Sequence, residues 1–539
     1  MIDFAKTYDV VIAGGGPVGL GLAIELGQRG HSVAVAERST RLHNIPRGQN
    51  LTQRTMEHFH FWGCEDDIRA ARTVPRDYAI GGMTSYRTLL SGYHYDWLQR
   101  GMVRPYYFTD NERLPQYATE AVLRARAARV GGIDIGYGLT CQGVEQDASG
   151  ATAILGDDHG ASHRLSGRYL VGADGSQSVV REMAGITQTK NEHDKRMVLL
   201  VFKSRKLHEY LERYPGKQFY CVLDRELQGY WLFFGRVDLG TTWFFHAPVP
   251  ADTTRESFDF KGYLERAVGA EIDVEFDHIG FWDLRIALAD SYRAGNIFIA
   301  GDACHSHPPY GGYGINTGLE DARNLGWKLA AMLEGWGSDA LLDSYTEERQ
   351  PVFRATADQF IERFIREDRD FLNTHSPEEQ GETAFRQAWD TRNEGASEVM
   401  AFAPNYDGSS MVWGNDAARP SAVGTHEFRV RAGHHLPPRA LPDGTNAYDR
   451  LGAGFTLFSH SDHADLARKF EDAARDLSVP LNVVHLENCD AFSDWQAQAV
   501  LVRPDNYVAW TGPSEEDPAA ILTHCIRGAS THHDGQPDA

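Results

Sequence analysis

The segment that most constrains the fold of this chain is YDVVIAGGGPVGLGLAIELGQRGHSVAVAER, residues 8–38. Val10 to Ala13 form a short apolar run of the kind that a buried parallel strand shows. Gly14, Gly16 and Gly19 follow at once as G-x-G-x-x-G. In this motif the first glycine permits a tight turn, the second lets a pyrophosphate approach the backbone, and the third lets a helix pack on the strand. The segment therefore predicts a strand, a phosphate-binding turn and a helix.

A second predicted strand ends in an acidic residue at a spacing that suits nucleotide binding. Residues 32–36 read as this strand, and Glu37 follows them, eighteen residues after Gly19. A carboxylate there can accept hydrogen bonds from a ribose diol, while the positive end of the preceding helix can hold phosphates. The register of strand, helix, strand and acid favours a dinucleotide site over a plain glycine-rich turn, and it leaves NAD and FAD both open.

Two later segments repeat the order of strand, turn and helix. Residues 168–186, RYLVGADGSQSVVREMAGI, have Asp174 in the predicted turn. Residues 293–337 run from a buried strand through GDACHSHPPYGGYGINTG into a helix over 315–333, whose apolar residues recur at helical spacing. Asp302 therefore lies at the carboxyl end of a strand, where open α/β sheets bind their ligands.

Taken in this order, the three motifs resemble those of the single-component FAD-dependent aromatic hydroxylases. This family includes phenol hydroxylase, 2,4-dichlorophenol monooxygenase and 3-(3-hydroxyphenyl)propionate hydroxylase. Residues 46–63, PRGQNLTQRTMEHFHFWG, are similar to the family's arginine-bearing segment, and residues 114–127, LPQYATEAVLRARA, to its glutamine-bearing helix. The resemblance covers nearly the whole chain. It is specific for FAD and for monooxygenase chemistry but not for a substrate, because these motifs bind the cofactor.

The resemblance implies an α/β fold with three parts. They are an FAD-binding Rossmann-like domain of the aromatic hydroxylase type, an inserted antiparallel β substrate domain and a C-terminal thioredoxin-like α/β domain. We expect the discontinuous FAD domain, with its helical linker, at 1–185 and 286–400, and the substrate domain at 186–285 with parts of 75–110. The C-terminal domain is expected at 425–530. It has no C-x-x-C pair, so we expect a structural or dimer-contact role without dithiol chemistry.

The resemblance also assigns FAD contacts along the chain. It implies that the pyrophosphate contacts Gly14, Gly16, Val18 and Gly19, and that the adenosine ribose contacts Glu37 with the adjacent Arg38. Arg47 would lie on the flavin side, and Gln116, Arg124 and Asp302 would lie near the pyrophosphate and ribityl chain. Asp174 belongs to a motif shared by FAD and nicotinamide binding, and the backbone of Gly314, Ile315 and Asn316 would face the pyrimidine edge of the flavin. No second complete G-x-G-x-x-G marks a separate nicotinamide site.

The reaction implied by the resemblance uses NADH or NADPH and O2 as co-substrates. Hydride reduces the flavin, O2 forms a C4a-hydroperoxide, and one oxygen atom passes to a phenolic or related aromatic ring. The protein supplies position, electrostatics and exclusion of water. Pro308 and Pro309, which lack N–H donors, are expected to form a dry wall beside the reacting carbon. A polyketide-tailoring hydroxylase, a Baeyer–Villiger oxygenase and an FAD dehydrogenase stay open as alternatives on the same fold.

A general base is expected, because electrophilic attack on a phenol is faster once its hydroxyl has lost its proton. The aspartate that serves in phenol hydroxylase is matched here by Gln49, whose amide cannot accept that proton. His246 and Tyr220 are the other candidates, so the base stays unassigned. The residues predicted to line the substrate pocket, each with ordinary core packing as its alternative, are Tyr220, Trp231, Phe233, His246 and Pro309.

Cys304, His305 and His307 also raise the alternative of a transition-metal site. The family has a histidine at the position of His305 without a metal, so we predict no metal and expect Cys304 to fill a small apolar space.

Composition narrows the setting of the reaction. A net charge of −22 argues against nucleic acid, whose phosphates need a basic face. Six scattered cysteines without a C-x-x-C pair suit a reducing compartment, and no apolar run approaches the roughly 18 residues of a membrane helix. We therefore predict a cytoplasmic enzyme that acts on a small aromatic substrate without a membrane, and a homodimer is a further expectation.

Overall fold

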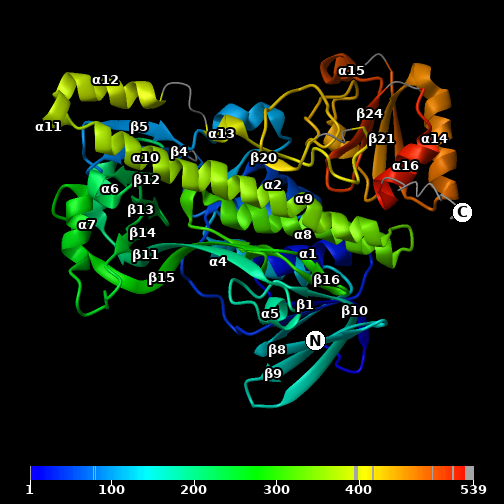
Figure 1. Ribbon diagram of the computed structural model, residues 1–539, viewed down its shortest axis with the longest axis horizontal. Helices are drawn as coiled ribbons and strands as arrows, with labels where there is room; N and C mark the ends of the chain where they lie inside the picture. The colour runs from blue at the N-terminus through cyan, green and yellow to red at the C-terminus, as the bar shows by residue number, and fades with distance from the viewer. Residues whose placement is uncertain are drawn as a thin grey trace, which may run out of the picture.

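The first sheet of the computed structural model holds the β1–α1 motif in the middle of its strands (Figure 1). The structure describes residues 2–76, 78, 81–393, 398–414, 418–487, 490–512 and 515–528. The strand order is β16-β17-β10-β1-β2-β7, and β10 also pairs with β9, which pairs with β8. The strands are β1 (Thr7–Ala13), β2 (Val33–Glu37), β7 (Ile133–Tyr137), β8 (Leu139–Asp147), β9 (Gly150–Asp157), β10 (Ser162–Gly172), β16 (Arg293–Ala294) and β17 (Ile297–Ile299).

Parallel pairing brings the ends of the motif strands to one edge of this sheet. β1 pairs in parallel with β2 and with β10, and β10 pairs in parallel with β17. The apolar run from Val10 to Ala13 is buried because helices cover the sheet. Helix α1 (Pro17–Gln28) packs against both α4 (Gln116–Ala127) and α8 (Tyr313–Leu333). The strands and helices predicted for the three motifs are therefore present.

The structure has a second eight-stranded sheet, with the order β18-β15-β11-β14-β13-β12-β4-β5. Neighbours are antiparallel except β12 and β4, which run in parallel. Residues 81–97 therefore supply two strands to a sheet built mainly from residues 188–289. Its strands are β4 (Gly81–Tyr86), β5 (His94–Trp97), β11 (Gln188–Lys203), β12 (Lys217–Leu223), β13 (Trp231–Arg236), β14 (Thr242–Val249), β15 (Glu275–Ala289) and β18 (His305–Ser306).

The two faces of this second sheet bury different residues. Helices α6 (Arg205–Leu211) and α7 (Phe260–Val268) pack on one face and share a hydrophobic core with it. The other face joins the large core of the first sheet. Because successive strand residues point to opposite faces, each aromatic side chain of β12, β13 and β14 belongs to one core or the other.

Long helices run through the middle of the molecule, between the second sheet and the C-terminal unit (Figure 1). They include α8 and α9 (Asp339–Ala357), and the chain continues from α9 through the π-helical turn η5 (Asp358–Glu362) into α10 (Arg363–Thr374). The short α11 (Pro377–Gln380) and then α12 (Glu382–Asn393) follow at the end of the molecule away from the C-terminal unit, above β5 in Figure 1. Ser376 caps the start of α11. Ile365, Asp368 and Leu372 of α10 are buried, so this helix packs against the rest of the chain.

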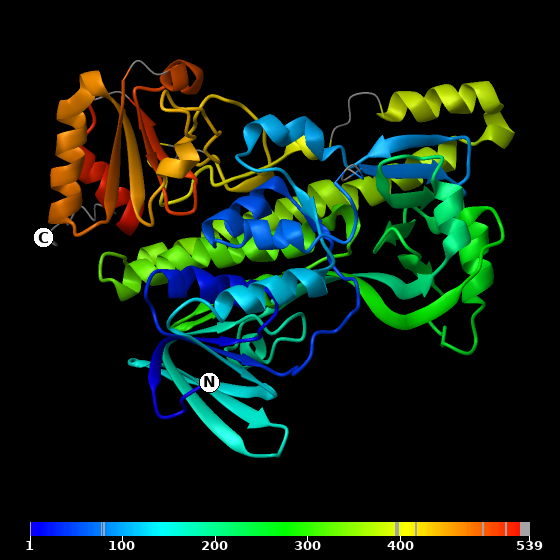
Figure 2. The same ribbon diagram turned by 180° about the vertical axis from the view of Figure 1, so that it is seen from behind.

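The C-terminal unit has its own four-stranded sheet, with the order β22-β21-β23-β24. Figure 2 shows it on the far side of the long helices from the first sheet. Its strands are β21 (Phe455–His460), β22 (Leu481–Leu486), β23 (Ala499–Val502) and β24 (Val508–Gly512), and its helices are α14 (Ala464–Asp476), α15 (Asp490–Trp495) and α16 (Pro518–Arg527). The unit matches the expected α/β architecture. The predicted ranges 286–400, 425–530 and 75–110 each include residues that lie outside the described ranges.

Within the described residues, no helix combines the length and the apolar character that crossing a membrane requires.

Candidate active site

The glycine-rich turn after β1 has the shape of a phosphate cradle. Gly14 has a φ of +110°, and a Cβ there would overlap the carbonyl oxygen of Ala173. A Cβ on Gly19 would overlap the carbonyl oxygen of Gly14, so the helix can approach the strand only without a side chain. A Cβ on Gly16 would meet nothing within 4 Å. Gly16 therefore faces open space at the N-terminus of α1, whose N–H groups attract anions.

The third motif meets this cradle through Val18. A Cβ on Gly301 would lie 3.0 Å from Val18 Cγ2, and one on Gly318 would lie 2.7 Å from it. The start of α1, the turn η3 (Gly301–Ala303) and α8 are therefore in close contact. The second motif joins them because Arg181 Nη1 donates to the carbonyl oxygen of Ala303 at 3.0 Å. Motifs separated by nearly 300 residues thus form one site.

Glu37 marks one end of this site. Its Oε2 accepts from Gly15 N at 2.7 Å and its Oε1 from Ser39 N at 2.7 Å, and the adjacent Arg38 is exposed. Burial raises the pKa of the Glu120 carboxyl on α4. The charge of Arg124 lowers this pKa and the charge of Glu37 raises it, so the three side chains are neighbours. Arg124 Nη2 donates to Glu120 Oε1 at 2.8 Å, while its buried Nε has no partner among the described residues.

One face of α4 extends from Glu37 towards the start of α8. Gln116 and Arg124 are eight residues apart on this helix, so they share a face two turns apart. Gly48 links Gln116 to α8, because a Cβ on Gly48 would lie 3.3 Å from Ile315 Cβ and 3.7 Å from Gln116 Oε1. The face therefore spans the distance between the predicted adenosine and flavin ends.

Asp302 and His307 are two polar residues of the third motif. The Asp302 side chain is exposed, and desolvation by the surrounding protein raises the pKa of its carboxyl, against the opposing charges of His305 and Arg47. His307 is half-buried, burial lowers its pKa to about 4, and its Nε2 has no partner in the described structure. The cradle at Gly16 and these polar groups fit an extended dinucleotide such as FAD.

The N-terminus of α8 is held in place by Asn316. Its Oδ1 accepts from Thr52 N at 2.9 Å and from Thr55 Oγ1 at 2.6 Å, and its Nδ2 donates to Asn50 O at 2.7 Å. The side chain is thus used by the protein, while Gly314 and Ile315 stay half-buried at the positive end of the helix. Only the backbone of these three residues was predicted to meet the flavin.

Asp174 has a structural side chain beside the cradle. Its Oδ1 accepts from Ser178 Oγ at 2.5 Å and its Oδ2 from Val180 N at 3.1 Å. It therefore organises the start of α5 (Val179–Met183), while its backbone N lies 3.0 Å from the point that a Cβ on Gly14 would occupy.

The possible metal ligands do not converge. His305 Nε2 lies 2.7 Å from Asp321 Oδ2, and Asp321 also accepts from Arg349 Nε at 2.8 Å. Cys304 is buried, with its Sγ 4.0 Å from the hydroxyl of Tyr345. In the described part of the chain, no three His, Cys, Asp or Glu side chains gather as metal ligands would. His305 is thus a buried partner of a carboxylate.

Three of the predicted pocket residues lie on the face of the second sheet that looks towards the first. Trp231 packs on Tyr310 with ring centroids 4.8 Å apart, and Tyr310 follows the half-buried Pro309. Phe233 stacks on His246, with centroids 6.4 Å apart. Burial lowers the pKa of His246 to about 4, and its buried Nδ1 has no described partner. His246 is therefore neutral at pH 7 and a weak proton acceptor.

Tyr220 lies on the opposite face, so the structure does not bring it to this pocket. Its hydroxyl donates to Lys217 O at 2.9 Å and accepts from Arg236 Nε at 3.3 Å. Its ring belongs to the core behind the sheet, and burial raises the pKa of its hydroxyl. Alternation along β12 is the reason, because Phe219 and Cys221 on either side of Tyr220 face the first sheet.

The side chain of Gln49 accepts a hydrogen bond from the buried Arg113. Its Oε1 accepts from Arg113 Nη2 at 2.5 Å, and Arg113 Nη1 donates to Gln218 Oε1 at 2.8 Å. The guanidinium also lies 4.6 Å from the ring centroid of Phe219. Burial, with a contribution from Arg236, lowers the pKa of Arg113 to about 9. The amide of Gln49 thus meets a buried cation that no described carboxylate pairs with.

Two residues that no sequence motif marked also reach the pocket. Trp97, the last residue of β5, packs near Phe233 and Tyr310, with centroids 6.2 and 5.7 Å away. Its Nε1 donates to Glu398 Oε2 at 3.2 Å. Glu398 begins α13 (Glu398–Ala401), a short helix in a segment whose sequence carries no recognisable signal.

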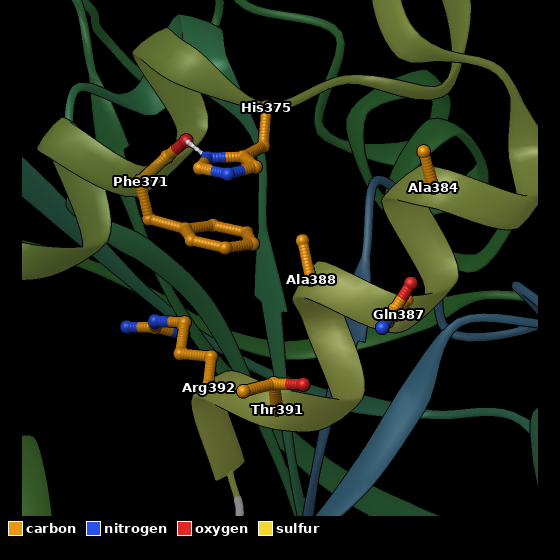
Figure 3. Close-up of a pocket in the computed structure, with 7 residues that line it drawn as sticks. All are labelled: Phe371, His375, Ala384, Gln387, Ala388, Thr391 and Arg392. Carbon is orange, nitrogen blue, oxygen red and sulfur yellow. Dashed lines mark hydrogen bonds between the residues drawn. The ribbon is translucent and has the colours of Figure 1, made fainter.

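A separate hollow of about 470 Å³ lies between α10 and α12 (Figure 3). In Figure 3 the ring of Phe371 stacks under that of His375, and their centroids are 4.5 Å apart. Its lining residues are Phe371, His375, Ala384, Gln387, Ala388, Thr391 and Arg392. None of the predicted site residues is among them, so this hollow is not the place of the FAD chemistry.

Comparison with known proteins finds two family models that match this chain. The family described as "FAD binding domain" matches residues 7–360, and the family described as "Aromatic-ring hydroxylase, C-terminal" matches residues 429–529. A 4-methyl-5-nitrocatechol 5-monooxygenase of Burkholderia sp is 30% identical over 96% of this chain and 96% of its own length. A putative polyketide hydroxylase of Streptomyces halstedii is 31% identical over 95% and 96%.

Solved structures show the same likeness. The flavin-dependent monooxygenase PieE, in complex with FAD and substrate, has a TM-score of 0.81 and 25% identity, covering 97% of this chain and 99% of that one. The ternary complex of aklavinone-11 hydroxylase with FAD and aklavinone has a TM-score of 0.77 and 25% identity over 98% and 100%.

Proposed function

This chain belongs to the FAD-dependent aromatic-ring hydroxylases, and we propose from that premise that it uses NADH or NADPH to hydroxylate a phenolic ring. It is a flavoprotein monooxygenase, which leaves the dehydrogenase alternative without support. One observation supports the proposal most directly: Trp97, Trp231 and Phe233 form an aromatic wall, and Trp97 and Trp231 pack on Tyr310, three residues after His307 in the third motif. Such a wall suits the binding of a flat ring.

The residues of the chain divide the work of binding. The N–H groups at the start of α1 bind the pyrophosphate beside Gly16, and the face of α4 with Gln116 and Arg124 lies along the cofactor. The flavin, when bound, would accept hydride and activate O2. The positive end of α8 stabilises negative charge on the flavin's pyrimidine side. Pro309 contributes no N–H donor to the pocket and so keeps that wall dry.

The proposal is tested with the purified yellow protein and a panel of phenols. We expect NADH or NADPH to bleach the flavin under anaerobic conditions, and a true substrate to accelerate the bleaching. On admission of O2, hydroxylated product should form in proportion to nicotinamide consumed. Oxidation of nicotinamide that yields only peroxide with every phenol would contradict the proposal. The oxygen-transfer route expected from the sequence stays a prediction until such measurements are made.

A polyketide-tailoring hydroxylase is the second candidate. It is favoured by the description of one relative, the putative polyketide hydroxylase of Streptomyces halstedii. Polycyclic phenols in the same panel distinguish the two, because only the preferred class should accelerate flavin reduction and give coupled product. Analysis of the product separates ring hydroxylation from Baeyer–Villiger insertion.

A further inference from the structure

Glu398 is a carboxylate held by neutral donors. Its Oε1 accepts a hydrogen bond from the hydroxyl of Tyr313, and its Oε2 accepts from Trp97 Nε1 at 3.2 Å. In the described part of the chain no lysine, arginine or histidine forms an ion pair with it. Asp368 on α10 differs, because it is paired with Arg392. Glu398 is therefore a half-buried carboxyl whose charge is not neutralised by contact with a cation of the described residues.

Glu398 keeps part of its surface accessible. It is half-buried, and desolvation by the surrounding protein raises the pKa of its carboxyl. One of its partners, Trp97, belongs to the aromatic wall near Tyr310 and Phe233. The other, Tyr313, is the first residue of α8, next to the backbone predicted to meet the flavin. Glu398 thus connects the aromatic wall to the flavin end of the site.

Several charged and titratable groups face Glu398 from the surrounding elements. Arg100 of η1 (Arg100–Tyr106) and Arg363 of α10 lower its pKa, although neither contacts it as an ion pair. Asp368 lies near enough for the two carboxyls to repel each other. The remaining neighbours are the buried hydroxyls of Tyr310 and Tyr313 and the thiol of Cys221.

The other candidate bases are weaker. Gln49 is an amide committed to Arg113, Tyr220 lies behind the sheet, and the pKa of His246 is lowered to about 4 by burial. Each oxygen of Glu398 has accepted one hydrogen bond from the protein, and a carboxylate offers about four acceptor sites. Glu398 can therefore accept one more hydrogen bond, from a ligand bound beside Trp97.

We propose that Glu398 is the general base that takes the proton from the ring hydroxyl of the substrate, and this rests on the proposed function. The O–H bond of the substrate breaks, the proton forms an O–H bond with a carboxylate oxygen of Glu398, and the electron pair stays on the substrate oxygen. The ring then carries the negative charge that makes its carbon attack an electrophilic oxygen faster. Tyr313 is a positioning residue, which holds the carboxylate towards the pocket.

The test compares Glu398→Gln with the wild type over phenols of graded acidity. We expect kcat of Glu398→Gln to fall about 10²- to 10³-fold for weakly acidic phenols, the usual contribution of a general base. For nitrophenols that are already ionised at the assay pH, kcat should stay within a few-fold of wild type. Flavin content, melting temperature and the substrate Kd, measured from the change in flavin absorbance on binding, should change little. These three measurements separate loss of the base from misfolding.

The pH profile supplies an independent reading. Wild-type kcat should decrease on the acid side as Glu398 becomes protonated, and Glu398→Gln should lack this limb. Tyr313→Phe removes a hydrogen bond that lowers the pKa of Glu398, so its acid limb should move to higher pH. Asp368→Asn is the matched control, because it alters a neighbouring carboxyl that is already paired, and its acid limb should remain.

Two outcomes overturn the inference. One is an equal loss of kcat in Glu398→Gln for weakly and strongly acidic phenols, and the other is disappearance of the acid limb in Asp368→Asn but not in Glu398→Gln. If the wild type itself gives no hydroxylated phenol, the proposed function fails instead. The two failures are therefore distinguishable.

Discussion

At the scale of the residue, the same amino acid has different roles within one motif. Gly14 and Gly19 are required by packing, because a side chain on either would overlap a backbone carbonyl oxygen. Gly16 faces open space and is required by nothing in the protein itself. A ligand is the remaining reason for the absence of a side chain there, since a pyrophosphate needs close approach to the backbone.

This difference predicts opposite results for two alanine substitutions. Gly16→Ala should leave the melting temperature of the apoprotein near wild type but weaken FAD binding by about tenfold or more, because the methyl group occupies the cradle. Gly19→Ala should lower the stability of the apoprotein itself by about 1–3 kcal/mol, the usual cost of overpacking. Thermal melting of both apoproteins and FAD titration by fluorescence check the pair. Equal destabilisation of the two apoproteins would contradict the assignment.

Gln49 allows a test of the unpaired cation beside it. Gln49→Glu would place a carboxylate against Arg113, and a hydrogen-bonded charge pair is expected to add about 1.5–3 kcal/mol to the free energy of unfolding at pH 7. The pKa of the new carboxyl would be depressed in the folded state, so its contribution is present above about pH 4.3 and lost as the pH falls further. Urea denaturation at pH 7 and at pH 4 measures this, with Gln218→Glu as a second position against the same guanidinium.

At the scale of the element, the loop between β23 and β24 fastens the C-terminal unit to the long helices. Arg503 Nη2 lies 2.9 Å from Glu348 Oε2 of α9 and 2.6 Å from Asp505 Oδ2. Lys328 of α8 donates to Glu348 Oε2 at 2.7 Å, and all four side chains are buried. The two positive and two negative charges compensate one another in the protein interior. Removal of one charge would therefore leave another buried charge without compensation.

Removing one member of this cluster should be costly. Arg503→Met leaves Glu348 and Asp505 with Lys328 alone, and an uncompensated buried charge typically costs about 3–5 kcal/mol. Arg468→Ala is the control, because its pair with Asp465 is exposed and exposed pairs contribute only about 0–1 kcal/mol. Chemical denaturation measures both. A loss below about 1 kcal/mol in Arg503→Met would show that the cluster relaxes or takes up water.

At the scale of the whole molecule, the C-terminal unit is not an independent appendage. Trp327 and Leu341 of α8 and α9 share one hydrophobic core with Phe455, Leu457 and other residues of its sheet. The same helix α8 begins at the flavin end of the site. The unit therefore packs on the helix whose N-terminus is predicted to meet the flavin. The structural role expected for the unit and the expected homodimer both stay predictions.

A shared core predicts cooperative unfolding. Tryptophan fluorescence, to which Trp327 and Trp510 of this core contribute among the eleven tryptophans of the chain, should change in the same thermal transition that releases FAD. Differential scanning calorimetry should show one transition. A separate, earlier transition in tryptophan fluorescence, with FAD still bound, would show that the C-terminal unit melts on its own.

What the sequence by itself determined is the cofactor and the class of enzyme. The turns at Gly14, Asp174 and Asp302 are local patterns, because strand, turn and helix each have a signature within a few residues. Their order along the chain was enough to place FAD and the class of reaction. The fold class followed from the same resemblance.

What only the tertiary structure decided is which side chains meet the substrate. Strand register, which no local pattern specifies here, turned Tyr220 behind the sheet and Phe233 to the front. Glu398 reaches Trp97 across 301 residues of sequence, and a contact made by chain folding over such a distance leaves no periodicity or motif to detect. The cofactor was therefore readable from the sequence, whereas the proposed base required the folded chain.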